Sequence, residues 1–244
     1  LQANPWCFFD CIARTDVLAH FPACAAMFIR GDVSEAKEAL VAAVDMKNYQ
    51  ETMIKNKSVN FDFKAMGLDN RLSLIHHTSL DFSGGGKSPA EIQSLPADQK
   101  IFVSDTKEIT WNTEKADAAY LSVNTPQTKF FTGFPEGRKI DLGGVTLEIG
   151  NTRLNWATVS LVSRYGTGFG ESGQSADILV AATGVSENSG RTLKPMGGIK
   201  ITLPDRGGAP VLAEGIPAIL TLTSDPQKTK CYALDPHGDR KAEV

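Results

Sequence analysis

The stretch WATVSLVS, residues 156–163, decides the fold class of this chain. Its apolar side chains Ala157, Val159 and Leu161 alternate with Trp156, Thr158 and Ser160. Successive side chains of a β-strand point to opposite faces, so this alternation is typical of a strand with one buried face. We therefore predict a half-buried strand, with Trp156 on the side opposite the small apolar residues.

Similar short runs occur on both sides of this strand, and turn residues such as Gly, Asn and Asp separate them. Many short strands without helical periods between them favour an antiparallel sandwich. We predict a mainly β protein with an Ig-like or jelly-roll-like β-sandwich over residues 101–244. The further predicted strands are residues 101–104, 108–111, 118–123, 129–131, 145–149, 177–182, 218–223 and 230–233.

Residues 1–32 predict a short helical segment ahead of the sandwich. Pro22 suits the first turn of a helix, residues 23–29 (ACAAMFI) are all apolar, and Gly31 is a typical helix stop. A helix that is apolar on every side is normally buried on every side, so we expect this one to need a larger neighbour. Residues 33–100 are predicted to be a connecting region within the sandwich, with short strand and helix elements. Residues 39–44 fit a strand or a helix, and we favour a strand; residues 64–75 can hold one short helix, and residues 83–89 form an exposed Gly-rich loop.

Composition excludes several classes of function. The 244 residues carry 25 Lys+Arg and 28 Asp+Glu, a net charge of -3. A balanced chain without a basic stripe is not an electrostatic nucleic-acid binder. No apolar run approaches the ~18 residues of a membrane span. The chain begins at Leu1, with no leader before NPWCFF, and we expect it to continue a longer protein.

The cysteines do not predict a metal site. Cys7, Cys11, Cys24 and Cys231 lack the C-x-x-C spacing of a zinc site. Reduced, buried thiols are the simplest interpretation, and a disulfide stays open if the protein is exported. We predict no metal and no cofactor.

The sequence also offers no catalytic constellation. Gly166, Gly168 and Gly170 lead into another strand instead of a helix, so they form no phosphate cradle. His76 and His77 are adjacent and point apart, so at most one can join a Ser/His/acid set. The acidic residues at strand ends are scattered, and no two are paired by sequence. We assign no catalytic residue.

Aromatic side chains are the better candidates for a ligand site. Trp6, Trp111, Trp156, Tyr120 and Tyr165 could offer flat faces on which sugar rings stack. The same residues serve equally well as core or interface aromatics. We carry them forward as speculative carbohydrate-binding residues.

Residues 16–33 (DVLAHFPACAAMFIRGDV) resemble the end of the (β/α)8 barrel in cellulase-like and agarase-like glycoside hydrolases, where the last helix leads through an Arg-Gly-Asp-Val turn into a C-terminal sandwich. The resemblance implies that the catalytic carboxylates lie in an upstream barrel, and that this chain alone does not hydrolyse glycosides. It also implies a secreted or periplasmic protein. Further segments similar to the accessory sandwich of these enzymes are residues 109–112, 119–128, 142–148, 157–163 and 232–238.

Three functional hypotheses follow. The first is a non-catalytic C-terminal accessory module that supports the barrel, or a fragment of it, and contacts a polysaccharide or oligosaccharide. The second is an autonomous carbohydrate-binding module. The third is a self-contained, esterase-like hydrolase that uses His76 or His77. An apolar helix left exposed would also predict self-association.

Overall fold

The computed structural model describes residues 14–56, 63–64, 66–135, 137–165, 167–169, 177–195, 201–225, 227–235 and 237–244. It is mainly β, as predicted. The predictions for Trp6, Cys7, Cys11, Gly166 and Gly170 fall outside these residues. Within the described chain, no helix is long and apolar enough to cross a membrane.

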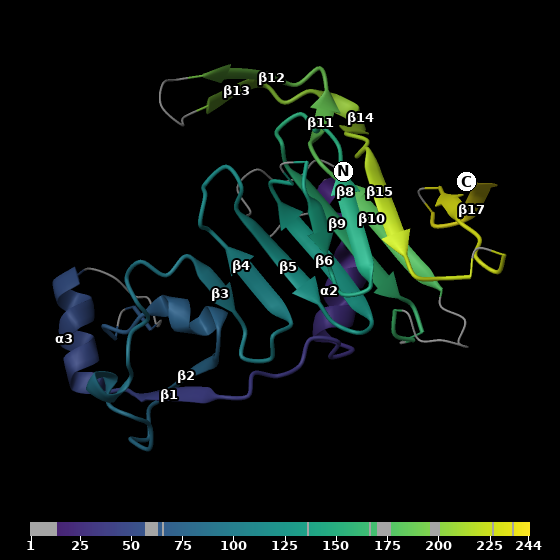
Figure 1. Cartoon of the computed structure of the whole chain (residues 1–244). Coiled ribbons are helices and arrows are strands. Elements are labelled where there is room, and N and C mark those ends of the chain that lie inside the picture. The colour runs from purple at the N-terminus through teal and green to yellow at the C-terminus, as the bar shows by residue number, and fades with distance from the viewer. Residues whose placement is uncertain are drawn as a thin grey trace.

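An antiparallel six-stranded sheet forms the centre of the molecule (Figure 1). The 156–163 stretch supplies one of its central strands, next to an edge strand of the sheet. Almost every residue of this strand is buried, so the prediction of a single buried face is wrong. In spatial order the strands are β10 (Ile178–Thr183), β9 (Ala157–Ser163), β6 (Thr128–Gly133), β5 (Tyr120–Asn124), β4 (Ile109–Asn112) and β3 (Ile101–Val103).

A three-stranded antiparallel sheet covers one face of β9 and β6, in a sandwich-like arrangement (Figure 1). Its strands are β15 (Ala218–Leu222), β8 (Val145–Ile149) and β7 (Lys139–Asp141). The Ig-like or jelly-roll-like type stays a prediction. The apolar faces of the two sheets enclose the main core, whose buried members are Phe131, Ile140, Leu142, Val145, Leu147, Ile149, Ala157, Val159 and Leu161.

The helical segment covers the other face of the same strands. Helices α1 (Thr15–Leu18) and α2 (Phe21–Phe28) lie behind the sheet in Figure 1. Ala23 and Ala26 of α2 pack with Val162 of β9. These two alanines are the buried residues of α2, so the prediction of a helix buried on all sides is wrong. The six-stranded sheet covers only one side of α2.

His20, between the two helices, ties them to the sheet. Its ring nitrogens lie 2.8 Å from the hydroxyls of Ser160 on β9 and Thr183 on β10. The ring also makes an edge contact with Phe130, at 5.8 Å between centroids. A hydroxyl can donate or accept, so a neutral imidazole satisfies both bonds.

A buried ionic cluster holds the chain just after α2. The Arg30 guanidinium donates two hydrogen bonds to the Asp32 carboxylate, at 2.7 and 2.5 Å. Asp32 also accepts from the Thr128 hydroxyl of β6, and Arg30 donates to the Ser163 carbonyl of β9. The carboxylate is almost fully buried, with 2% side-chain exposure. The cluster therefore fixes the exit of the helix to two central strands.

Residues 33–100 differ from the prediction that they belong to the sandwich. Strands β1 (Ala39–Ala43) and β2 (His77–Asp81) form a separate parallel sheet. The expected strand at 39–44 is present, whereas α3 (Met46–Asn56) was not predicted. Two 3₁₀ turns, η1 (Asn70–Leu74) and η2 (Pro89–Glu91), complete the region. Its own apolar cluster contains Leu40, Ala42, Phe63, Leu68, Leu72 and Ile92.

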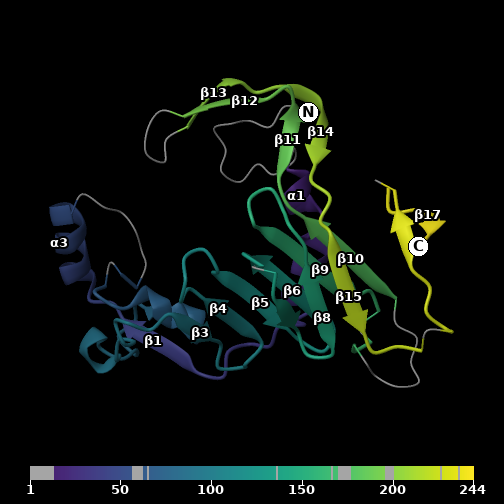
Figure 2. The ribbon, with the colours of Figure 1, turned by 45° about the horizontal axis from the view of Figure 1, so that its top comes forward.

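Three two-stranded ribbons lie outside the two-sheet core, which therefore takes up only part of residues 101–244 (Figure 2). The ribbon that projects farthest is β12–β13 (Figures 1 and 2). The pairs are β11 (Ser186–Ser189) with β14 (Gly208–Ala213), β12 (Thr192–Pro195) with β13 (Ile201–Asp205), and β16 (Tyr232–Leu234) with β17 (Arg240–Glu243).

Removing the Asp32 carboxylate should be costly. Burial alone would raise the pKa of Asp32, but hydrogen bonds from Arg30 and Thr128 outweigh it and lower that pKa. We expect Asp32→Ala to reduce the free energy of unfolding by about 2 kcal/mol in urea titrations, because Thr128 loses its acceptor and Arg30 keeps only its backbone carbonyl partners. The exposed Lys139–Glu148 pair is the control, and Glu148→Gln should cost at most about 1 kcal/mol. Equal costs for the two variants would contradict this account.

His20 should make stability depend on pH. Burial lowers the pKa of its imidazole, so the folded protein binds a proton there less readily than the unfolded chain does. The unfolded chain binds a proton below about pH 6.5, so stability should fall as the pH drops from 7 to 5. The contribution is at most about 1.4 kcal/mol per pH unit. Urea titrations at both pH values should show a smaller loss for His20→Gln than for the wild type; parallel losses would refute the assignment.

Candidate functional site

The aromatic residues proposed for carbohydrate binding do not share one surface. Tyr120 on β5 pairs with Asn112 on β4, whereas Trp111 pairs with Leu121. Paired residues share a face and neighbours along a strand do not, so Trp111 and Tyr120 point to opposite faces of the sheet. The structure therefore gives no flat strip that combines these two rings.

Each of these rings also has a local packing partner. Tyr120 stacks on Phe131 of the main core at 5.8 Å between ring centroids, and the Arg138 guanidinium lies over the Tyr120 ring, 4.8 Å from its centroid. Trp111 contacts Phe102 at 6.1 Å between centroids. These contacts fit the alternative interpretation, in which the rings serve packing.

Trp156 and Tyr165 lie beyond opposite ends of β9 (Ala157–Ser163). Trp156 makes an edge contact with Phe134 at 5.0 Å. Tyr165 is 76% exposed, with Arg164 at 5.6 Å from its ring centroid. The length of the strand separates the two rings, so they cannot stack on one sugar unit.

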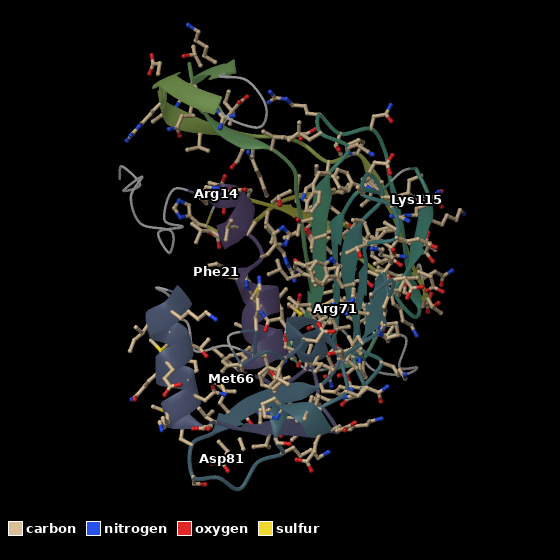
Figure 3. All side chains as sticks on the ribbon, turned by 90° about the vertical axis from the view of Figure 1, so that its left-hand side faces the viewer. Arg14, Phe21, Met66, Arg71, Asp81 and Lys115 are labelled. Atoms are coloured by element: carbon tan, nitrogen blue, oxygen red, sulfur yellow. The ribbon has the colours of Figure 1, made fainter. Side chains whose placement is uncertain are left out.

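Five exposed apolar side chains lie on the helical segment, and we call them the outer helical face. It comprises Val17, Leu18, Phe21, Phe28 and Ile29, all of which are exposed. Phe21 lies on the side of α2 turned away from the six-stranded sheet (Figure 3). The remaining exposed residues of α2 are Pro22, Cys24 and Ala25, so its solvent side carries no charged side chain.

A cleft of about 410 Å³ opens in the 33–100 region. It forms where β1, the turn η1 and the start of β2 meet the segment 87–96. Its lining combines an apolar floor with polar side chains of both charges. The lining residues are Glu38, Leu40, Leu72, His76, Lys87, Glu91, Ile92, Gln93, Ser94, Leu95 and Pro96.

His76 is the oriented histidine of this cleft. Its Nδ1 lies 3.1 Å from Oδ2 of Asp105 and 3.7 Å from Oε2 of Glu38. Backbone N–H groups of Glu38 and Lys37 lower the pKa of Asp105, and the contact with His76 adds to them. The carboxylate accepts a hydrogen bond from Nδ1–H, which leaves Nε2 for a further hydrogen bond. His77 is exposed, so the structure selects His76 from the adjacent pair.

The Gly-rich loop after β2 brings Lys87 to this cleft. The Asp81 carboxylate accepts from the backbone N–H groups of Ser83 and Gly85, at 2.7 and 2.6 Å, and so closes the loop on itself. A Cβ on Gly86 would lie 2.7 Å from the backbone nitrogen of Ala43. Only glycine permits this approach, which lets the Lys87 backbone exchange two 2.8 Å hydrogen bonds with β1.

The cleft does not contain an assembled hydrolase triad. Ser94 lines it, but within the described residues no hydrogen bond joins its hydroxyl to His76. Ser88 is engaged with Glu91, at 2.6 Å. Nucleophile and base must come within hydrogen-bond reach, so this geometry gives the esterase hypothesis no nucleophile.

Sequence reasoning named His76 but missed its partners. Asp105 is 29 residues away, and Glu38 and Lys87 come from separate segments. No local sequence motif indicates that the turn after β3 places the Asp105 carboxylate beside the residues just before β1. Across the described residues, no three His, Cys, Asp or Glu side chains gather as a metal site.

Comparison with known proteins gives no match: no protein-family model, no curated protein sequence and no solved structure is significantly similar to this chain.

Proposed function

We propose that this chain is a non-catalytic C-terminal accessory module of a polysaccharide-degrading glycoside hydrolase, and that it docks on the catalytic (β/α)8 barrel. The observation that carries the proposal is what we call the inverted packing of α2: its small side chains face the sheet and its large apolar ones are exposed. The helix buries Ala23 and Ala26 against its own sheet and exposes Phe28 and Ile29, at 89% and 83%. A helix with only one partner would normally bury its large apolar side chains.

Burial of the outer helical face by a second partner would be energetically favourable. Fully burying a Phe or Ile side chain is worth about 1.5–3 kcal/mol. A protein that docks over Phe28 and Ile29 would gain both contributions, together with smaller ones from Val17, Leu18 and Phe21. The same helix lies within the segment that resembles the end of a glycosidase barrel, so the barrel is the partner that we propose.

Two carboxyl groups in and behind the cleft, Glu91 and Asp105, lack the raised pKa of a general acid, which supports a non-catalytic role. A glycosidase needs one carboxyl group with a raised pKa as its general acid. Hydrogen bonds from the Ser88 hydroxyl and backbone instead lower the pKa of Glu91. The pKa of Asp105 is also lowered. Both groups are therefore poor proton donors near neutral pH.

The proposal predicts that the gene encoding this chain, or one beside it, encodes a (β/α)8 barrel. Expressed as separate polypeptides, the two should co-elute in size-exclusion chromatography. The variant Phe28→Asp with Ile29→Asp should raise the Kd at least about 100-fold, because two large apolar contacts are lost. Circular dichroism should confirm that the variant is folded.

The control variant is Leu154→Asp with Ile219→Asp, which changes two exposed apolar residues away from the outer helical face (67% and 63% exposed). It should leave the affinity unchanged. The proposal fails if no barrel is encoded there, or if both double variants bind the barrel equally well. Hydrolysis of a soluble β-glucan by the chain alone, abolished by one carboxylate substitution, would also overturn it.

A further inference from the structure

The cleft beside β1 combines an apolar floor with polar groups that have spare hydrogen-bonding capacity. Leu40, Leu72 and Ile92 are buried members of the local core that also line the cleft. A volume of about 410 Å³ falls within the usual range for small-molecule sites. The cleft can therefore hold a ligand that has both an apolar face and polar edges.

His76 supplies a positioned imidazole to this cleft. Because Nδ1–H is bonded to Asp105, Nε2 is the ring nitrogen that is left for a ligand. Asp105 is itself held by the backbone N–H groups of Lys37 and Glu38, both at 3.0 Å. The orientation of the imidazole thus exists before any ligand binds, which lowers the entropic cost of recognition.

Glu38 and Lys87 supply an acceptor and a donor at the rim. The Glu38 carboxylate lies 3.7 Å from Nδ1 of His76, and its side chain is 57% exposed. The Lys87 ammonium forms no ion pair with any described residue, although Glu91 is close enough to sense its charge. The backbone of Lys87 is fixed on β1 by two hydrogen bonds, so only its side chain has to order on binding.

The charged groups of the cleft and the side chains that line it indicate which class of ligand it can bind. Glu38, Glu91 and Asp105 outnumber Lys87 in and behind the cleft, so a phosphate or carboxylate ligand would meet net repulsion. Of the described lining residues, none is a Trp, Tyr or Phe, so recognition cannot rest on stacking. An uncharged ligand with several hydroxyls matches the available donors and acceptors.

We propose that this cleft binds one or two uncharged hexose units of an oligosaccharide. His76 Nε2 and the Glu38 carboxylate form hydrogen bonds with sugar hydroxyls, Lys87 Nζ donates one, and the C–H face of the ring lies on Leu40, Leu72 and Ile92. The choice of a sugar rests on the proposed accessory role. The site itself is separate from the outer helical face.

The test is calorimetric titration of the whole chain with cellotetraose and neoagarotetraose, both uncharged, and with tetragalacturonate, which is anionic. We expect at least one uncharged oligosaccharide to bind and tetragalacturonate to bind at least tenfold more weakly. Glu38→Ala and Lys87→Ala should each raise the Kd about tenfold, as the loss of one hydrogen bond to a charged group predicts. His76→Gln should also raise the Kd, and amide NMR spectra should show that each variant is folded.

Matched controls separate this site from the aromatic residues and from the docking surface. Trp111→Ala and Tyr165→Ala should leave the Kd unchanged, as should Phe28→Asp with Ile29→Asp. Binding that Glu38→Ala and Lys87→Ala do not weaken would overturn the proposal, as would preferential binding of tetragalacturonate or no binding of either uncharged sugar. Because barrel docking is measured with other variants, failure of one proposal is distinguishable from failure of the other.

Discussion

The burial of β9 on both faces is the constraint on which the rest of the structure depends. Ala157, Val159 and Leu161 fill the core under the three-stranded sheet, while Ser160 and Val162 face the helical segment. The three-stranded sheet covers one face of β9 and α2 covers the other. The helix must therefore be anchored in place against the sheet. Two polar anchors do this: His20 before α2, and the Arg30–Asp32–Thr128 cluster after it.

The inverted packing of α2 follows from this anchoring. Phe130, Val162 and Leu179 already supply bulk on the sheet, so the helix meets them with Ala23 and Ala26. Large side chains at those positions would push the helix away from the sheet and break the bonds of His20. The large apolar residues of α2 consequently lie on its outer side. The contact with the sheet therefore determines which surface is left for a second partner.

The parts of the fold that sequence could predict are those set by neighbours along the chain. The alternation around Val159 predicted a strand, and Pro22 and Gly31 placed the helix between them. The same sequence could not show what covers each face, so the burial of β9 was underestimated and that of α2 overestimated. Pairing across the sheet was equally hidden: alternation within β4 and β5 says nothing of their register, which separates Trp111 from Tyr120. The parallel pairing of β1 with β2 joins segments more than thirty residues apart and had no local signal.

The turn between β3 and β4 connects the sandwich to the cleft. Asp105 accepts hydrogen bonds from the backbone N–H groups of Lys37 and Glu38, just before β1, and from His76. Glu108 accepts two from Ser34. The segment between α2 and β1 is therefore held by two carboxylates of one turn. The cleft has no stacking surface among its described lining residues, so it must bind a ligand through hydrogen bonds and aliphatic contacts. Its hydrogen-bonding groups therefore need to be positioned in advance, because ordering them on binding costs side-chain entropy. Asp105 provides this for His76 with a carboxylate that also holds the segment before β1, so the proposed site needs no added structural element.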